Sequence, residues 1–300
     1  MTKRLQALDP REREAFEKQA ANIKLAFFDI DGTLLDSNAQ LPESARQAIA
    51  QLQTQGVTTA VASGRPLFAA QQWIDALKLD GAGLFCTGAL VYDPKQQQEL
   101  TSAPLPFFAV QNLVDMARAT KTHCELYTDR AYHIESTTEF TELHNRYLRI
   151  EPELGPFDAR LLATPIYKVQ LVFELPRDEP VYQSFRQRFP ELVFAAGHGA
   201  DRPEVLFASV VAAEACKQQA FNALCAYHGV SADQVLSLGD AGSDKVFLRE
   251  AGLGIAMGNA VDEVQAEANY VTAHVDEGGL AMALNAVSSA LGSRGNPGYA

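Results

Sequence analysis

The sequence predicts an α/β fold in which a doubly wound parallel sheet forms the core and an α+β cap domain is inserted into it. Near both ends of the chain, short apolar segments alternate with amphipathic ones, which is typical of parallel strands covered by helices. Between these regions, turn clusters separate segments of alternating hydrophobicity, such as Ile166 to Phe173. We therefore expect an N-terminal extension at 1–21, a core domain at 22–92 and 212–300, and the cap domain at 93–211.

The first half of the core is predicted from apolar runs and from helical spacing. A continuous apolar run, Ile23 to Ile30, indicates a strand that is buried on both faces. Apolar residues at helical spacing follow Pro42, and Gly56 ends that helix. The other elements expected here are a strand at Val57 to Ala62, a helix from Pro66 and a short strand at Gly83 to Cys86.

The same alternation of strands and helices returns after the cap domain. The expected strands are Val235 to Leu238, Leu253 to Met257 and Tyr270 to Val275. The expected helices are Asp244 to Glu250, residues 260–268 and a last helix from Gly279. We expect the tail at 293–300, SRGNPGYA, to be disordered.

The composition is that of a soluble globular protein. The chain has 300 residues, of which 47% are hydrophobic and 21% charged. A net charge of −12 argues against nucleic acid or an anionic membrane as the main partner. The apolar runs are too short for a membrane span, and the charged first residues do not form a signal peptide. The four cysteines lack metal-binding spacing, so we expect reduced thiols and a cytoplasmic location. The sequence carries no signal for an oligomeric state.

Two carboxylates end the first predicted strand, in the segment DIDGT. Asp29 and Asp31 stand two residues apart, so both project from one face of the strand. They lie beyond the carboxyl end of a parallel strand, where such folds bind ligands, and Gly32 allows a sharp turn there. Paired carboxylates repel each other unless a cation relieves them, and Mg²⁺ fits that need. Taken alone, this segment is about as consistent with a solvated turn as with a metal site.

Two further motifs follow other predicted strands. In GDAGSD, Asp240 ends a strand and Asp244 begins a helix. In ASGR, the Ser63 hydroxyl and the backbone around Gly64 offer a phosphate cradle, although Ser63 alone is equally consistent with a helix cap. Acidic strand ends of one parallel sheet converge readily on a shared metal ion. The three motifs together predict a Mg²⁺-dependent phosphoryl-transfer site.

The combination of DIDGTLLD at 29–36, ASGR at 62–65 and GDAGSD at 239–244 resembles the haloacid dehalogenase superfamily. The insertion after the third core strand is similar to that of its Cof-type phosphatases, which carry a large α+β cap. Two later segments, AMGNA at 256–260 and DEGG at 276–279, are also similar to that subfamily. The resemblance covers about residues 23 to 285, closely in the core and loosely in the cap.

This resemblance implies a role for each matching residue. Asp29 attacks phosphorus and forms an aspartyl-phosphate, and Asp31 is the general acid and base. The expected ligands of Mg²⁺ are Asp29, the backbone carbonyl of Asp31 and Asp240, with Asp244 beside them. Ser63 and Gly64 bind the phosphoryl oxygens, and Lys217 is the best match to the lysine that completes the phosphate-binding set. From the sequence alone, Lys217 is also consistent with an ordinary exposed helix lysine.

The chain departs from the family pattern at three places. Thr87 stands where the family has Asn, and Ser243 stands where it has Asn before the second acidic residue of its motif. Glu214 and Gln218 replace the glycines expected near Lys217. These departures concern residues around the metal site and leave every carboxylate in place.

Three functional hypotheses follow from the motifs and the resemblance. The first is a Mg²⁺-dependent phosphatase for small phosphorylated metabolites such as sugar phosphates. The second is a phosphomutase on the same fold. The third is a phospho-ligand-binding protein with weakened catalysis, which the departures from the family pattern suggest. We expect the cap to determine substrate choice, because it covers the mouth of the core.

Overall fold

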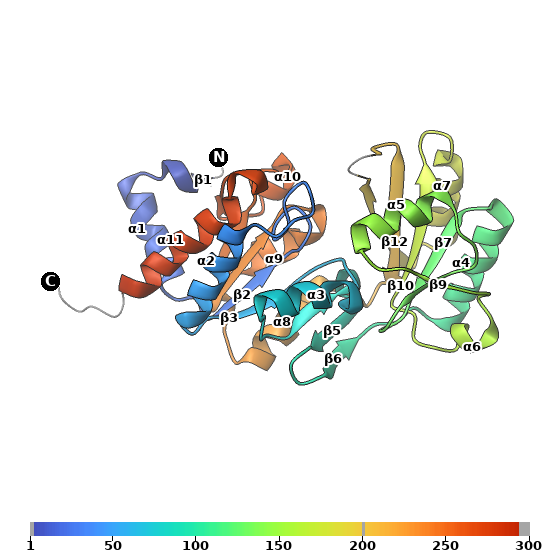
Figure 1. Cartoon of the computed structure of the whole chain (residues 1–300), viewed down its shortest axis with the longest axis horizontal. Helices are drawn as coiled ribbons and strands as arrows, with labels where there is room; N and C mark the ends of the chain where they lie inside the picture. Colours follow the sequence, from blue (N-terminus) through green and yellow to red (C-terminus); the bar gives the residue numbers. More distant parts are fainter. Residues whose placement is uncertain (1–2, 200–201, 294–300) are drawn as a thin grey trace.

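A six-stranded parallel sheet forms the centre of the first of two lobes, the core lobe. The computed structural model describes residues 3–199 and 202–293. The strand order is β1-β15-β14-β13-β2-β3, and each neighbouring pair is parallel (Figure 1). Because β2 and β13 are neighbours, the segments that follow them lie side by side at the carboxyl end of the sheet. The strands are β1 (Lys3–Arg4), β2 (Leu25–Phe28), β3 (Thr58–Val61), β13 (Val235–Gly239), β14 (Leu253–Ala256) and β15 (Tyr270–Val271).

Helices cover both faces of this parallel sheet, as the sequence predicted. Alternate side chains of β2 point to opposite faces, so Phe28 packs among one group of helices and Phe27 among the other. The first group is α1 (Pro10–Ala20), α2 (Glu43–Thr54), α3 (Leu67–Leu77) and α11 (Gly279–Ser293). The second group is α8 (Lys217–His228) and α9 (Lys245–Glu250), while α10 spans Asp262–Gln265. Among the described residues, each helix is too short or too polar to cross a bilayer.

The second lobe, the cap lobe, has a six-stranded sheet of a different kind. Its strand order is β11-β12-β10-β7-β8-β9, and all pairs are antiparallel except β8 with β9. Helices α4 and α7 pack on its apolar face and α5 lies on the other (Figure 1). The strands are β7 (His123–Tyr127), β8 (Tyr132–Ile134), β9 (Glu153–Leu154), β10 (Lys168–Glu174), β11 (Leu192–His198) and β12 (Val205–Ala212). The helices are α4 (Phe107–Thr120), α5 (Glu139–Leu148), α6 (Ala159–Leu162) and α7 (Glu179–Arg188).

A small antiparallel sheet lies between the two large ones. It consists of β4 (Gly83–Phe85), β5 (Leu90–Asp93) and β6 (Gln98–Ser102). A single parallel bridge between Leu84 of β4 and Ala62, the residue after β3, connects this small sheet to the edge of the parallel sheet. The predicted domain boundary at residue 93 therefore falls inside a hairpin, and the domain limits remain a prediction.

The N-terminal segment contributes to the core lobe. Strand β1 pairs with β15 at the edge of the parallel sheet. Helix α1 begins with a capping box at Asp9, and its Phe16 ring makes an edge-to-face contact with Tyr270 at 5.2 Å. Phe16 and Ala20 are buried in the core, which fixes α1 against the sheet.

The C-terminal elements are shorter than the sequence predicted. The strand expected at 270–275 ends at Val271, and the helix expected at 260–268 spans only Asp262–Gln265. Val275 instead begins a 3₁₀ turn at Val275–Glu277, and its amide donates a hydrogen bond to the Asn259 side-chain oxygen at 3.0 Å. Residues 294–300 of the tail expected to be disordered lie outside the described residues, and Ser293 ends α11.

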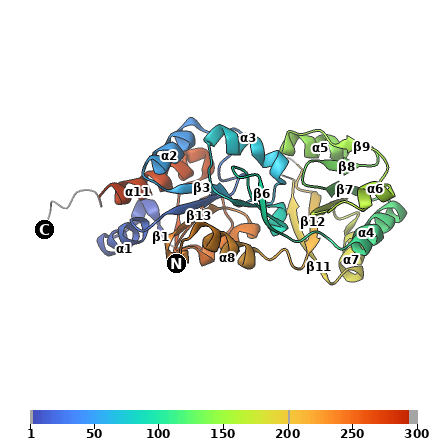
Figure 2. The same ribbon diagram turned by 90° about the horizontal axis from the view of Figure 1, so that it is seen from below.

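The two lobes touch through the C-terminal part of α5 and the strand ends of the cap sheet. Arg65 of the core lobe donates a hydrogen bond to the Tyr147 carbonyl at 2.7 Å, and Arg149 lies 5.5 Å from the Trp73 ring. Phe68 of α3 stacks on Tyr127 of the cap sheet at 6.3 Å. Figure 2 shows α3 next to the cap lobe, near α5. These contacts place the cap lobe beside the carboxyl end of the parallel sheet.

Candidate active site

Three carboxylates converge at the carboxyl end of the parallel sheet. Asp29 directly follows β2, Asp240 directly follows β13, and Asp244 ends the short 3₁₀ turn before α9. One oxygen from each lies within 4.8 Å of the other two. Asp29 and Asp244 are buried, and Asp240 is partly buried. The structure thus brings together three of the residues for which the sequence predicted a metal-binding role.

The motif loops hold these carboxylates through hydrogen bonds. The Asp29 amide donates to the Leu238 carbonyl at 3.0 Å, which ties the ends of β2 and β13 together. Asp244 accepts from the amides of Asp240 and Ala241 at 3.1 and 2.9 Å. Such backbone contacts fix a carboxylate without a second charged side chain. The two strand ends and the 3₁₀ turn therefore form one preorganised cluster.

Asn259 supports the cluster and was missed in the sequence analysis. Its side-chain nitrogen donates to Asp240 at 3.0 Å and to the Gly32 carbonyl at 2.9 Å. Thr33 donates to the other Asp240 oxygen at 3.3 Å. Asn259 belongs to the AMGNA segment at 256–260, which is similar to the family. The sequence of that segment does not indicate that Asn259 supports the carboxylates. Asn259 thereby joins the two acidic loops from a third direction.

The electrostatics of the cluster are those of a cation site. Burial and the neighbouring charges of Asp244, Asp240 and Asp31 raise the pKa of Asp29 well above its usual value. Burial, followed by the charge of Asp244, raises the pKa of Asp240 to about 7. Burial also raises the pKa of Asp244. A hard divalent cation relieves this repulsion, and an all-oxygen set is what Mg²⁺ prefers.

The Asp31 carboxylate lies apart from this cluster. Its side chain is 55% exposed, and Arg65 binds it in a two-pronged contact with both distances at 2.7 Å. Its predicted metal role rests on the backbone carbonyl instead. Arg65 itself is buried, and the same guanidinium also donates to the Tyr147 carbonyl of α5. Arg65 thus connects the predicted general acid to the cap lobe, a role that the ASGR motif did not reveal.

The predicted phosphate cradle lies at the end of the neighbouring strand. Ser63 follows β3 by two residues and is buried, and its amide donates to the Leu84 carbonyl at 3.0 Å. Its hydroxyl accepts a hydrogen bond from the Arg65 amide at 3.3 Å, whereas the N-cap of α3 is Pro66, so Ser63 does not cap this helix. A Cβ atom on Gly64 would be 3.5 Å from the Thr87 hydroxyl, so the two loops are adjacent.

Lys217 stands beside the carboxylates at the first turn of α8. It is partly buried, and its ammonium donates to the Ser243 carbonyl. Burial lowers its pKa, and the charges of Asp244 and Asp29 oppose that shift. Its environment therefore differs from that of an exposed helix lysine. A cation at this point neutralises charge next to Asp29.

Comparison with known proteins identifies the family. The model of the haloacid dehalogenase-like hydrolases matches residues 26–284. The chain belongs to this family. It is 28% identical to the pyridoxal phosphate phosphatase YbhA of Escherichia coli, over 81% of this chain and 90% of that protein. It is 25% identical to the phosphatase YwpJ of Bacillus subtilis, over 86% of this chain and 98% of that protein. A haloacid dehalogenase-like hydrolase from Bacteroides thetaiotaomicron superposes with a TM-score of 0.78 at 24% identity, covering 88% and 98% of the two chains.

These findings confirm the resemblance and the fold predicted from the motifs. Family membership and the phosphatase relatives support assignment of this haloacid dehalogenase-like hydrolase as a phosphoric monoester hydrolase. Members of the family generally use a divalent metal, and the acidic cluster suits one. The roles predicted for the individual site residues remain predictions.

Two departures from the family pattern have different structural consequences in this hydrolase. Ser243 still donates a hydrogen bond to Asp244, at 3.2 Å, as an Asn side chain can. Thr87 has φ 60°, a left-handed conformation that Asn tolerates and a β-branched residue disfavours. Ser243 therefore keeps a side-chain hydrogen bond to the Asp244 carboxylate. Thr87, by contrast, adds backbone strain beside the predicted phosphate cradle.

We predict that Gly32→Ala lowers activity far more than a matched glycine substitution. Gly32 has φ +77°, and a Cβ atom there would lie 2.3 Å from an Asp240 oxygen. Displacement of the Asp240 carboxylate, a predicted metal ligand, is expected to lower kcat/KM about 100-fold. Gly56 has φ +83° with open space around it, so Gly56→Ala carries only the backbone strain of about 1–2 kcal/mol. Phosphatase assays and melting curves of both variants test this, and equal losses of activity would contradict it.

Proposed function

We propose that the chain is a Mg²⁺-dependent phosphatase that hydrolyses small phosphorylated metabolites, such as sugar phosphates, through an aspartyl-phosphate intermediate. The observation that carries the proposal is the cluster of Asp29, Asp240 and Asp244 at the carboxyl end of the sheet, with Lys217 beside it. The relative named as a pyridoxal phosphate phosphatase acts on a small phosphate ester, which supports the substrate class. In keeping with the net charge, we propose no nucleic acid or membrane partner and a cytoplasmic location.

Asp29 is the nucleophile in this proposal. One of its carboxylate oxygens forms a bond to phosphorus while the ester oxygen of the substrate leaves. Its burial removes competing water, and the loop from Asp29 to Leu35 is fixed by the bonds from the Leu34 and Leu35 amides to the Asp29 and Ile30 carbonyls at 3.3 and 2.9 Å. Asp29, Asp240 and the Asp31 carbonyl, with Asp244 beside them, would hold Mg²⁺, which would neutralise negative charge on the phosphate oxygens.

Asp31 is the general acid and then the general base. Its carboxylate is exposed toward solvent while Arg65 holds its orientation. In the first step it gives a proton to the leaving oxygen, and in the second it takes one from the water that attacks the phosphoaspartate. Because Arg65 also bonds to α5, the position of this acid depends on the cap lobe.

Ser63, Gly64 and Lys217 bind the transferred phosphoryl group in this proposal. Ser63 and Gly64 lie at the end of β3, next to the strand that carries Asp29. Lys217 offers its ammonium from the first turn of α8, near Asp244 and Asp29. Backbone amides, one hydroxyl and one cation match the charge and the acceptor oxygens of a phosphoryl group.

Release of inorganic phosphate tests the proposed function. The purified protein is expected to hydrolyse p-nitrophenyl phosphate in the presence of Mg²⁺, and EDTA is expected to lower the rate at least about tenfold. Assay of both phosphate and isomerised product from sugar phosphates separates a phosphatase from a phosphomutase. Binding of metal and phosphate without turnover of any ester would instead favour a phospho-ligand-binding protein.

A further inference from the structure

A buried cation of the cap lobe, Lys168, has no hydrogen-bonded partner among the residues that the structure describes. Lys168 is the first residue of β10 and is only 4% exposed. It pairs in register with Tyr127 of β7, and its ammonium lies 4.0 Å from the centre of the Tyr127 ring. Among residues 3–199 and 202–293, no acceptor hydrogen-bonds to this ammonium and no carboxylate lies within ion-pair distance of it. The contact with the Tyr127 ring stabilises this charge, and so does the longer-range charge of Glu125.

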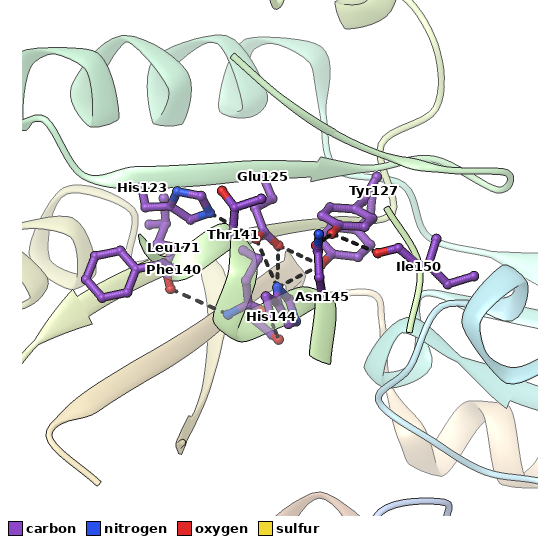
Figure 3. Close-up of polar contacts among 12 residues, drawn as sticks. His123, Glu125, Tyr127, Phe140, Thr141, His144, Asn145, Ile150 and Leu171 are labelled. Carbon is purple, nitrogen blue, oxygen red and sulfur yellow. Dashed lines mark hydrogen bonds and ion pairs between the residues drawn. The ribbon is translucent and has the colours of Figure 1, made fainter. Parts of the chain in front are cut away.

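The acidic residue nearest in the sheet, Glu125, is already satisfied by other groups. Figure 3 shows its fully buried carboxylate between two histidines and a tyrosine. It is 3.0 Å from His123, 2.7 Å from His144 and 2.6 Å from the Tyr127 hydroxyl, which donates to it. Burial acts to raise the pKa of Glu125, but the two histidines outweigh it and hold this pKa well below its usual value. Glu125 therefore acts on Lys168 through its charge alone, and no ion pair joins these two described residues.

The position of Lys168 adds positive charge where the two lobes meet. Burial lowers the pKa of Lys168, the charges of Cys86 and Glu125 oppose that shift, and the charge of Arg65 adds to it. Arg65 is itself engaged by Asp31. A buried charge that lacks a paired anion is strongly unfavourable, so the folded protein retains it against a free-energy cost. Such residues are found where a ligand supplies the missing charge.

Lys168 also lies close to the predicted phosphate cradle. Its charge acts on the Cys86 thiol, whose pKa burial raises to about 11. The Cys86 amide donates to the Arg65 carbonyl at 2.9 Å, and the next residue, Thr87, faces Gly64. Tyr167, immediately before Lys168, packs in the core-lobe cluster. Lys168 thus belongs to the cap lobe and lies near the loop that adjoins the predicted phosphate cradle.

We infer that Lys168 binds a second anionic group of the substrate, a carboxylate or a second phosphate, carried by the part of the ester that leaves. This inference rests on the proposed phosphatase function and adds the class of substrate. A strongly hydrated ammonium that is already buried gains most from an anion, because the anion replaces the water that burial removed. The aromatic face of Tyr127 holds the ammonium in place before the ligand arrives.

Pairs of phosphate esters that differ in one anionic group test the inference. Suitable pairs are glycerol 3-phosphate with 3-phosphoglycerate for a carboxylate, and fructose 6-phosphate with fructose 1,6-bisphosphate for a phosphate. The wild type is expected to prefer the doubly anionic member, and Lys168→Met is expected to lower that ratio of kcat/KM values about 10- to 100-fold. Lys168→Arg keeps the charge and is expected to retain most of the preference.

The control is Lys95→Met, which removes an exposed lysine from the β5–β6 turn and is expected to leave the ratio unchanged. Melting curves show whether the Lys168 variants are folded. The inference is overturned if the wild type has no such preference, or if Lys168→Met keeps it. Calorimetric titration of Asp29→Asn with the same pairs gives a second readout that needs no turnover. Equal affinity for both members of each pair overturns the inference there, whereas absence of p-nitrophenyl phosphate hydrolysis overturns the proposed function.

Discussion

Replacing Asp29 by asparagine is expected to abolish phosphatase activity while leaving the fold intact or more stable. The amide nitrogen and carbonyl of asparagine have nearly the shape of the carboxylate, but they do not attack phosphorus. Loss of an enzyme nucleophile lowers kcat by about 10⁴-fold or more. Activity of Asp29→Asn and of the wild type on p-nitrophenyl phosphate, at the same Mg²⁺ concentration, measures the effect.

The stability of the same variant separates a catalytic role from a structural one. The pKa of Asp29 is raised in the folded state by burial and by its acidic neighbours, so its ionisation opposes folding at neutral pH. Asparagine carries no charge, and in EDTA at pH 7.5 we expect Asp29→Asn to melt at or above the temperature of the wild type. Retention of full activity, or lost activity together with a collapsed melting temperature, would contradict the proposed nucleophile.

The acidic cluster was predictable because each member is fixed by a local rule. Asp29 and Asp240 each follow a run of buried apolar residues, and parallel strands end at a common side of their sheet. A strand shows in the sequence as an apolar run, and its end shows as the first charged residue. No local pattern in the sequence shows that β2 and β13 are neighbouring strands of the sheet. The family resemblance implied that Asp29 and Asp240 lie close together, because it assigned both to one metal ion.

The contacts between the lobes were not predictable from local patterns. Arg65 bonds to Asp31 and to α5, and these partners are separated from it by 34 and 82 positions. Lys168 and Glu125 are charged residues on a strand face that alternation alone assigns to solvent. They are buried because α5 and the core lobe cover that face of the cap sheet. Only the three-dimensional arrangement decides whether such residues are surface charges or parts of a site.

The second large effect is expected in the stability of the metal-free protein as pH rises. The pKa of Asp240 is about 7 in the folded state, well above the value of about 3.9 for an unfolded aspartate. A raised folded-state pKa gives stability that is complete below the unfolded pKa and is lost as pH rises through the folded one. Between pH 5 and 8 this amounts to at most about 3 kcal/mol, or roughly 5–10 °C in melting temperature.

Melting curves in EDTA and in Mg²⁺ across that pH range measure this effect. In EDTA the melting temperature is expected to fall toward pH 8, and Mg²⁺ is expected to restore more stability at pH 8 than at pH 5, because it binds the ionised cluster. Burial lowers the pKa of His133, so this histidine makes the folded protein more stable as pH rises, opposite to the effect of Asp240. The contribution of His133 is the same in the wild type and in the variants. Asp240→Asn is therefore the reference, since it removes the titrating carboxylate and leaves His133 in place. If the wild type in EDTA follows the same pH profile as this variant, the carboxylates do not repel one another and the cluster is not a cation site.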